Sequence, residues 1–189
     1  MDTVIHTYDK IANDFSNTRN YVWDMVKLFL NKQPNGSYGL EIGCGNGKNM
    51  KYKKDLNIIG VDKCNAFLNI CKQQQLNVVY SDCCYLPFKD NSFDFVISIA
   101  VFHHLDNIHF TKAINEMKRV MKKGAIGLIT IWSVENQSRK KFIDGDNMVP
   151  FNGINRYYNI FSKERLTLYL ENNYTIYNDH GNWVIELKV

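Results

Sequence analysis

Long apolar runs and CxxC cysteine pairs are both absent from this chain of 189 residues. No window approaches the roughly 18 consecutive apolar residues that a membrane-spanning helix needs, and the opening stretch MDTVIHTYDK lacks the apolar centre of a signal peptide. The cysteines number five, and an odd number without a secretion signal favours reduced thiols and argues against a structural zinc site. These absences predict a soluble, cytoplasmic protein.

Internal repeats and low-complexity tracts are absent too. The composition, with 45% hydrophobic and 22% charged residues, is that of an ordinary globular protein, and the length allows a sizeable core. The net charge of +4 permits contact with a polyanion without requiring it. We therefore expect a single domain.

Five short runs rich in Ile, Val and Leu follow the N-terminal segment, with little polar alternation. They span residues 37–43, 57–62, 77–82, 93–100 and 125–132. Such runs are typical of strands buried on both faces of a parallel sheet. Helical patterns lie between them. This alternation predicts βαβ units and an open, doubly wound α/β sheet, which binds ligands at the carboxyl ends of its strands.

The helical pattern is clearest from Phe110 to Met121, and Gly124 is expected to cap that helix. The tail predicts a strand at 156–161, a helix at 162–172, and strands at 174–179 and 182–189. His180 and Gly181 form a turn signal between the last two strands, which predicts a hairpin.

Gly43, Gly45 and Gly47 follow the first strand directly, in the stretch LEIGCGNGKNM. Glycines let the backbone turn tightly and approach a ligand. The spacing is GxGxG, unlike the GxGxxG of dinucleotide enzymes, and Glu41 precedes it within the strand. That difference favours S-adenosylmethionine over a dinucleotide, because this cofactor has no pyrophosphate to be bound. Its cationic methionine end is also stabilised by a nearby carboxylate.

Two further acids stand at successive strand ends. Asp62 closes the second strand, where a carboxylate can accept the ribose hydroxyls, and Asp82 closes the third, beside Cys83, where it can accept the adenine amino group. Ala100, at the end of the fourth strand, can offer its carbonyl to the methionine ammonium group. Each acid alone could instead cap a helix or end a solvated loop. Together with the glycines, they predict a cofactor-binding site.

These residues and FDFVISIAVFHHL (93–105) resemble class I S-adenosylmethionine-dependent methyltransferases. The segments YDKIANDFSNTR (8–19), EIGCGNGKN (41–49), IWSVEN (131–136), SRKK (138–141) and RYYNIFSKERL (156–166) resemble the tRNA wobble-uridine carboxymethyl methyltransferases. The resemblance covers nearly the whole chain. It implies a Rossmann-like fold with a seven-stranded, mostly parallel sheet that ends in a C-terminal antiparallel hairpin.

The resemblance also implies methyl transfer to the carboxylate of 5-carboxymethyluridine in tRNA. It implies a heterodimer with a small zinc-containing activator protein that covers an apolar sheet edge. The chain departs from the family at RNYVWD (19–24), where an aromatic-proline-Trp segment is usual, and at VPF (149–151), where VPW is usual. The long basic insertion common before the RYY segment is absent. A small-molecule methyltransferase of the same fold and a non-catalytic cofactor-binding subunit are the alternatives.

The expected catalytic residues are Arg19, His104 and Trp132. Because a carboxylate is ionised at neutral pH, its methylation needs no strong base, only alignment in a water-poor pocket. Arg19 can grip the carboxylate of the substrate or of the cofactor, or lie in solvent. His104 matches the family motif and is expected to face the acceptor, whereas His103 is expected to cap a helix or lie in the core, since at most one of the two should enter the pocket. Trp132 can stack on uracil or pack against the following loop.

Tyr8 and Phe15 share one helical face, and they either close over the cofactor or pack in the core. Arg139, Lys140 and Lys141 are expected to contact tRNA phosphates, with a solvated basic face as the alternative. A second basic cluster, at residues 118–123, is more easily explained as solvated. The expected layout is N-terminal helices at 1–37, a cofactor-binding βαβ core at 38–132, a substrate loop at 133–156, and C-terminal strands and a helix at 157–189.

Overall fold

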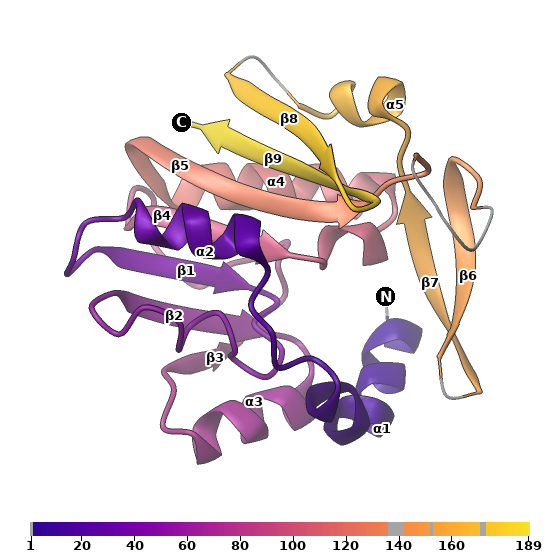
Figure 1. Ribbon diagram of the computed structural model, residues 1–189, viewed down its shortest axis with the longest axis horizontal. Helices are drawn as coiled ribbons and strands as arrows, with labels where there is room; N and C mark the ends of the chain where they lie inside the picture. The colour runs from indigo at the N-terminus through magenta and orange to yellow at the C-terminus, as the bar shows by residue number, and fades with distance from the viewer. Residues whose placement is uncertain (1, 136–141, 152, 171–172) are drawn as a thin grey trace.

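Seven strands form one sheet in the order β3, β2, β1, β4, β5, β9, β8 (Figure 1). The computed structural model describes residues 2–135, 142–151, 153–170 and 173–189. The strands of the sheet are β1 (Tyr38–Ile42), β2 (Asn57–Asp62), β3 (Val78–Tyr80), β4 (Phe93–Ile99), β5 (Met121–Trp132), β8 (Tyr174–Asp179) and β9 (Asn182–Lys188). The helices are α1 (Asp2–Asn17), α2 (Asp24–Asn31), α3 (Asn65–Gln73), the short 3₁₀ turn η1 (Phe102–His104), α4 (Asn107–Val120) and α5 (Lys163–Thr167).

The strands β1 to β5 pair in parallel, and β9 runs antiparallel to both β5 and β8. The mostly parallel sheet with a C-terminal hairpin, predicted from the sequence, is therefore confirmed. His180 and Gly181 turn between β8 and β9 with φ values of 48° and 79°. Positive φ at both central residues is the geometry of the type I′ turn, which is common in two-residue hairpins.

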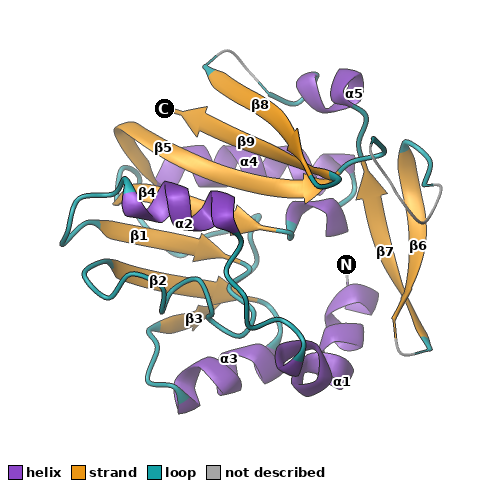
Figure 2. Cartoon of the chain, in the orientation of Figure 1, coloured by secondary structure: helices purple, strands orange, loops and turns teal. Residues whose placement is uncertain are grey.

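Helices cover both faces of the sheet (Figure 2). In β4, Phe95 and Ile97 pack in the core with residues of α2 and α3, while Val96, between them, packs in the core with residues of α4. All three side chains are fully buried. An apolar run without alternation thus corresponds to a strand that is covered on both sides. Among the described residues, no helix has the length and apolar character needed to cross a membrane.

Several segments differ from the sequence prediction. Turns rather than helices connect β1 to β2 and β3 to β4, and the helix predicted at 162–172 is the shorter α5. The helix α4 ends at Val120, and Gly124 lies inside β5 with φ of +82°, beside an irregularity in the pairing of β5 with β4, so Gly124 is not the predicted helix cap. The strand β6 (Gly145–Phe151) occupies part of the predicted loop and pairs with β7 (Ile154–Ile160) as a separate antiparallel hairpin. The sequence pattern does not predict β6 as a strand, because it contains Pro150, and proline within a sheet is tolerated only in an edge strand.

Candidate active site

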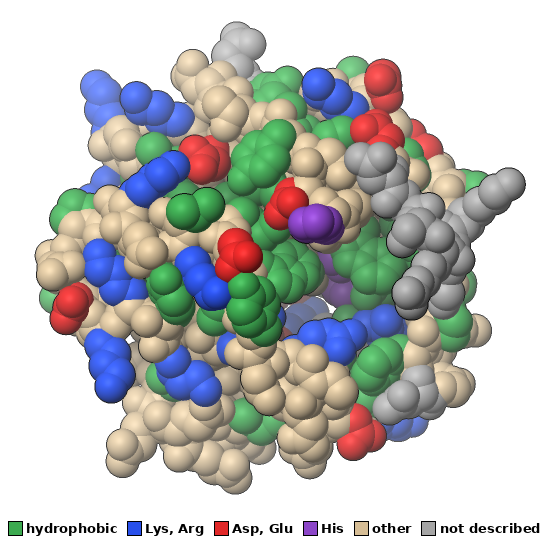
Figure 3. Space-filling view, in the orientation of Figure 1, with side chains coloured by type: hydrophobic (Ala, Val, Ile, Leu, Met, Phe, Trp, Pro, Cys, Tyr) green, Lys and Arg blue, Asp and Glu red, His purple; other side chains and the backbone are tan. Residues whose placement is uncertain are grey.

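A cavity of about 410 Å³ lies at the carboxyl ends of β1, β2, β4 and β5, and α1 and β7 supply further lining residues. Its volume falls within the range of small-ligand pockets, about 300–1,000 Å³. In the space-filling view, basic side chains and histidine gather around a hollow in this part of the surface (Figure 3). Most of the predicted site residues line the cavity: Tyr8, Arg19, Glu41, Gly43, Gly45, Asp62, Asp82, Cys83, Ala100, His104 and Trp132.

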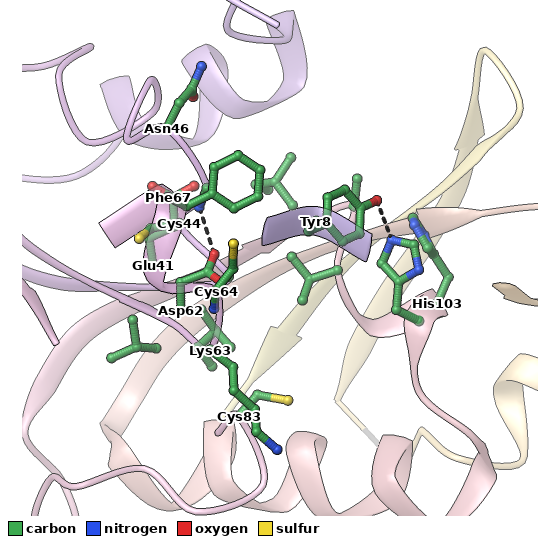
Figure 4. Close-up of a pocket in the computed structure, with 18 of the residues that line it drawn as sticks. Tyr8, Glu41, Cys44, Asn46, Asp62, Lys63, Cys64, Phe67, Cys83 and His103 are labelled. Atoms are coloured by element: carbon green, nitrogen blue, oxygen red, sulfur yellow. Dashed lines mark hydrogen bonds between the residues drawn. The ribbon is translucent and has the colours of Figure 1, made fainter. Parts of the chain in front are cut away.

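Gly43 and Gly45 form the turn that leaves β1, with φ of +71° and +52°. A Cβ on Gly43 would lie 2.4 Å from a methyl group of Val101, whereas a Cβ on Gly45 would meet no atom within 4 Å. The Gly45 N–H donates to Asp62 Oδ2 at 2.9 Å, so the end of β2 holds the turn in place (Figure 4). The backbone at Gly45 therefore borders open cavity, where a ligand can approach it closely.

Gly47 does not line the cavity, unlike the other two glycines. A Cβ there would lie 2.3 Å from a methyl carbon of Leu76 and 3.1 Å from the sulfur of Cys71, on α3. With φ of +72°, Gly47 serves the turn and its close packing against α3. This differs from the predicted role in cofactor binding, because glycine spacing alone does not separate contact with a ligand from contact with a helix.

The carboxylate of Asp62 holds the strand ends together. Besides accepting from Gly45, it accepts from the backbone N–H of Cys64 through Oδ1 at 2.9 Å. Burial raises the pKa of Asp62, although the backbone donors oppose that rise. Each carboxylate oxygen can accept a further hydrogen bond. The group could therefore order the glycine turn and still receive ligand hydroxyls.

Asp82 forms an ion pair that the sequence patterns do not predict. Its Oδ2 accepts from Nζ of Lys63, and its Oδ1 accepts from the backbone N–H of Cys84, both at 2.9 Å. Burial would raise the pKa of Asp82, but these two donors hold it below its ordinary value. Lys63 and Cys83 line the cavity beside it (Figure 4).

Glu41, near the end of β1, is only 1% exposed. Its Oε1 accepts from Nδ2 of Asn49 at 2.6 Å, and its Oε2 is buried with no hydrogen-bond partner among the described residues. Burial raises the pKa of Glu41 to about 8, so the side chain holds a proton at neutral pH. A cation bound in the cavity would favour its ionised form.

Ala100 leaves β4 with φ of +59°, an unusual conformation for a residue with a side chain. Its N–H donates to the backbone oxygen and to Oγ1 of Thr130, both at 2.9 Å, which holds the strained residue in place. Residues held in this region of φ often lie at functional sites. The position of Ala100 on the cavity wall is compatible with its predicted contact to the cofactor.

Arg19 lies exposed at the rim of the cavity. The carbon at the centre of its guanidinium group is 4.9 Å from the ring centroid of Phe15 and 5.8 Å from that of Phe151. The hydrogen bonds of this group within the described residues all go to Thr18. Arg19 therefore retains N–H donors for a ligand, and either carboxylate considered for it, that of the substrate or that of the cofactor, fits this position.

Both histidines line the cavity, whereas the sequence pattern predicts at most one there. The reason is η1: the chain leaves β4 as a 3₁₀ turn, in which successive side chains do not point to opposite sides as they do in a strand. His104 Nδ1 lies 2.8 Å from the carbonyl oxygen of Tyr157, and Nε2 lies 3.0 Å from the hydroxyl of Tyr8. Burial lowers the pKa of His104 to about 4, so the ring is neutral. It has no free N–H to offer a carboxylate, which differs from the predicted contact of His104 with the acceptor.

His103 belongs to an aromatic cluster with Trp132 and Tyr158. Its Nδ1 accepts from the backbone N–H of Trp132 at 3.1 Å, and its ring stacks on Tyr158 with centroids 4.6 Å apart. The ring of Trp132 lies 4.6 Å from that of Tyr158 and 5.6 Å from that of Phe142, and it also borders the cavity. Trp132 thus packs against its neighbours, and the predicted stacking on a base stays compatible with its position.

Arg156, on β7, is a cavity residue that the sequence patterns do not predict. It is 5% exposed, and its Nη1 donates to the hydroxyl of Tyr8 at 3.1 Å. The available signal is that Arg156, Tyr158 and Ile160 alternate along one strand face, and all three are buried. An arginine on an otherwise buried face marks a site where a charge is needed.

The basic residues differ in their surroundings. Arg119 pairs with Glu116 and Asp90, and Lys122 pairs with Asp94, each at 2.7 Å. They lie where α4 ends and β5 begins, at the amino ends of the parallel strands, whereas the cavity lies at their carboxyl ends. These ion pairs are compatible with the explanation of this cluster as a solvated basic face. Arg139, Lys140 and Lys141 lie outside the described residues.

Residues 40–129 match the family described as methyltransferase domain. The chain is 38% identical over 144 residues to the tRNA (carboxymethyluridine(34)-5-O)-methyltransferase of Schizosaccharomyces pombe, which covers 76% of this chain and 63% of that protein. It is 40% identical over 135 residues to the protein of the same name from Arabidopsis thaliana, which covers 71% of this chain and 33% of the relative. The chain thus spans less than two thirds of the length of these relatives.

Solved structures share the fold at low sequence identity. An S-adenosylmethionine-dependent methyltransferase from Methanosarcina mazei superposes with a TM-score of 0.70 at 17% identity, over 89% of this chain and 98% of that one. A putative methyltransferase from Haloferax volcanii, solved in complex with the Trm112 methyltransferase activator, superposes with a TM-score of 0.64 at 16% identity, over 95% and 96% of the two chains. The chain belongs to the class I S-adenosylmethionine-dependent methyltransferases, as a relative of the tRNA carboxymethyluridine methyltransferases.

Proposed function

We propose that the chain transfers a methyl group from S-adenosylmethionine to the carboxylate of 5-carboxymethyluridine at the wobble position of tRNA, giving the methyl ester. The names of relatives at 38% and 40% identity support this substrate. One structural observation carries the proposal: a single cavity has carboxylates at the ends of β1 and β2 and the guanidinium groups of Arg19 and Arg156 elsewhere on its wall. The carboxylates suit a cationic cofactor, and the guanidinium groups suit an anionic acceptor.

The residues present fit S-adenosylmethionine. Glu41 has a buried oxygen without a partner among the described residues, and Gly45 faces open cavity. We assign Glu41, Gly43, Gly45 and Ala100 to the methionine end, Asp62 to the ribose, and Asp82 with Cys83 to the adenine, with Tyr8 closing over the cofactor from α1. When bound, the cofactor supplies an electrophilic methyl group on a sulfonium centre.

The protein's own part in the reaction is alignment and exclusion of water. A carboxylate acceptor is ionised at neutral pH, and the neutral, hydrogen-bonded His104 is not needed as a base. Arg19 at the rim and Arg156 deeper in the cavity can fix the orientation of an anion. Trp132, at the end of β5, offers an aromatic face to the base that carries the carboxylate.

Mass spectrometry of wobble nucleosides tests the proposal directly. Hypomodified tRNA is incubated with S-adenosylmethionine and the chain, with and without a candidate activator, and Asp62→Ala serves as the cofactor-site control. We expect 5-carboxymethyluridine to be replaced by its methyl ester only with the unaltered chain. Unchanged carboxymethyluridine under both conditions would refute the function. A failure to bind S-adenosylmethionine in calorimetry would favour a non-catalytic subunit.

We also propose that the chain forms a heterodimer with a small zinc-containing activator, as the family resemblance implies. The solved complex of a methyltransferase activator with a putative methyltransferase from Haloferax volcanii supports a partner of this kind. Among the described strands, β3 pairs only with β2, so one edge of the sheet is open. Two of its residues, Val79 and Tyr80, are 38% and 54% exposed. An open apolar edge is a site where another chain can add.

Light scattering of the coexpressed proteins tests this partner. Tyr80→Asp should separate the heterodimer, while Tyr177→Asp, on the exposed face of β8 at the other edge of the sheet, should leave it intact. Full activity of a monomeric chain without any partner would contradict the proposal.

A further inference from the structure

Arg156 carries a buried charge without a matching acid. The residue is 5% exposed and lines the cavity. Its Nε is buried without a hydrogen-bond partner among the described residues, and no described carboxylate forms an ion pair with it. Its guanidinium carbon lies 4.9 Å from the ring centroid of Phe151 and 5.2 Å from that of Tyr158. Aromatic rings stabilise such a cation only in part, so a buried arginine in this setting requires an anion.

The neighbouring hydrogen bonds have a defined direction. The carbonyl oxygen of Tyr157 can only accept, so the hydrogen of the neutral His104 ring is on Nδ1. Nε2 of His104 is then an acceptor, and the hydroxyl of Tyr8 must donate to it. The oxygen of Tyr8 in turn accepts from Nη1 of Arg156 at 3.1 Å. The direction runs from Arg156 to Tyr8, to His104 and to the backbone of β7.

This direction determines what the cavity wall offers a ligand. The hydrogen of Tyr8 is used by His104, and both nitrogens of His104 have partners. The remaining N–H groups of Arg156 are therefore donors at this place, and they carry a positive charge. A carboxylate matches such a planar pair of donors, whereas the NH₂ of a carboxamide would meet another donor.

We propose that Arg156 binds the carboxylate of the methyl acceptor and selects it against the neutral amide, and that Tyr8 and His104 are positioning residues that fix the direction of its hydrogen bonds. The proposal deepens the proposed function and rests on it. Arg19 differs in being exposed at the rim, where its guanidinium group donates only to Thr18 among the described residues. Arg156, on β7, lies against the ring of Tyr158, whereas the carboxylates of the cavity stand at the carboxyl ends of β1, β2 and β3.

The test compares two anticodon stem-loop RNAs, one with 5-carboxymethyluridine and one with 5-carbamoylmethyluridine at the wobble position. Binding of each to the full chain, with its activator and S-adenosylhomocysteine, is measured by calorimetry. The unaltered protein should bind the acid about tenfold or more tightly than the amide. Arg156→Gln should bind both alike, with its affinity for S-adenosylmethionine unchanged within about twofold. Lys54→Gln, at an exposed position before the amino end of β2, should behave as the unaltered protein.

An unchanged preference for the acid in Arg156→Gln overturns the proposal. A variant that keeps this preference but loses affinity for S-adenosylmethionine also overturns it, because that result would assign Arg156 to the cofactor. If Arg156→Gln does not fold, Arg156→Lys keeps the charge without the planar pair of donors, and a full preference in that variant also overturns it. Nitrogen NMR of the His104 ring tests the positioning role of Tyr8. Tyr8→Phe should shift the Nε2 resonance of His104 and reduce the preference for the acid over the amide. A protein that prefers the acid but does not methylate it would refute the proposed function and leave the assignment of Arg156 standing.

Discussion

The hydroxyl of Tyr8 lies 3.0 Å from Nε2 of His104, and the two rings meet edge to face with centroids 5.4 Å apart. These residues are separated by 96 positions in the sequence, so the contact joins α1 to the exit of β4. One wall of the cavity is therefore made by the N-terminal helix, which also packs against α3 and β7. The cofactor core and the acceptor side become one site only when this helix is in place.

The buried carboxyl of Glu41 should make stability depend on pH. Burial raises its pKa from 4.5 to about 8, so over this interval the folded chain holds a proton that the unfolded chain has released. The contribution of Glu41 to the free energy of unfolding is then fully present below about pH 4.5 and is lost as the pH rises through about 8. The loss is on the order of 5 kcal/mol at most. Denaturant titrations at several pH values should show this fall, and Glu41→Gln should flatten it.

Cofactor binding should be linked to the same proton. A cationic ligand favours ionised Glu41, so the affinity for S-adenosylmethionine should rise between about pH 5 and 8, with release of a proton. Calorimetry in two buffers of different ionisation enthalpy measures that release. Equal proton release by Glu41→Gln would show that another group is responsible.

Two glycines of one turn should respond differently to alanine. In Gly47→Ala the added Cβ collides with Leu76, so the fold should lose about 1–3 kcal/mol while folded protein still binds the cofactor. In Gly45→Ala the Cβ enters open cavity, so the affinity for S-adenosylmethionine should fall about tenfold with a smaller loss of stability. Thermal unfolding and calorimetry separate the two effects, and the reverse pattern would contradict the assignment.

Arg19→Ala should reduce turnover by roughly a hundredfold and leave the fold intact, because a planar donor pair that orients a carboxylate is removed. Steady-state kinetics with S-adenosylmethionine and tRNA measure the decrease, and circular dichroism checks the fold. Lys54→Ala removes a charge before the amino end of β2, away from the cavity at the carboxyl ends of the strands, and should have no effect on turnover. Near-normal turnover in Arg19→Ala would remove this residue from the site.

The basic residues of the SRKK segment should control the salt dependence of tRNA binding. Replacing Arg139, Lys140 and Lys141 by alanine should weaken binding and lower the slope of log K against log salt by about 0.7–0.9 for each phosphate that the variant no longer neutralises. Alanine at Lys118 and Lys123, near the end of α4 and the start of β5, should not change the slope. Identical slopes in both variants would assign the SRKK segment to a solvated surface.

The sequence alone predicts the sheet, the parallel direction of its first five strands and the cofactor end of the site. These depend on local signals: apolar runs in β1 to β5, glycines after β1, and acids at strand ends, which parallel strands bring to one edge. The hairpin of β6 and β7 is not predicted, because Gly145, Asp146 and Pro150 make a polar edge strand resemble a loop. Gly47 shares the spacing of the glycines that face the cavity, but a Cβ there would meet Leu76 and Cys71, so spacing alone does not show which glycine a ligand can approach.

What only the tertiary structure decided is the acceptor side of the cavity. The sequence predicts His104 and Arg19 as site residues, but it cannot show that both nitrogens of His104 are hydrogen-bonded, one to Tyr8 and one to Tyr157. Nor can it show that Arg156, which follows Tyr8 by 148 positions, lies against its hydroxyl. Strand and helix patterns are set by neighbours in the chain. The charge that a cavity wall presents and the direction of its hydrogen bonds depend on residues that only folding brings together.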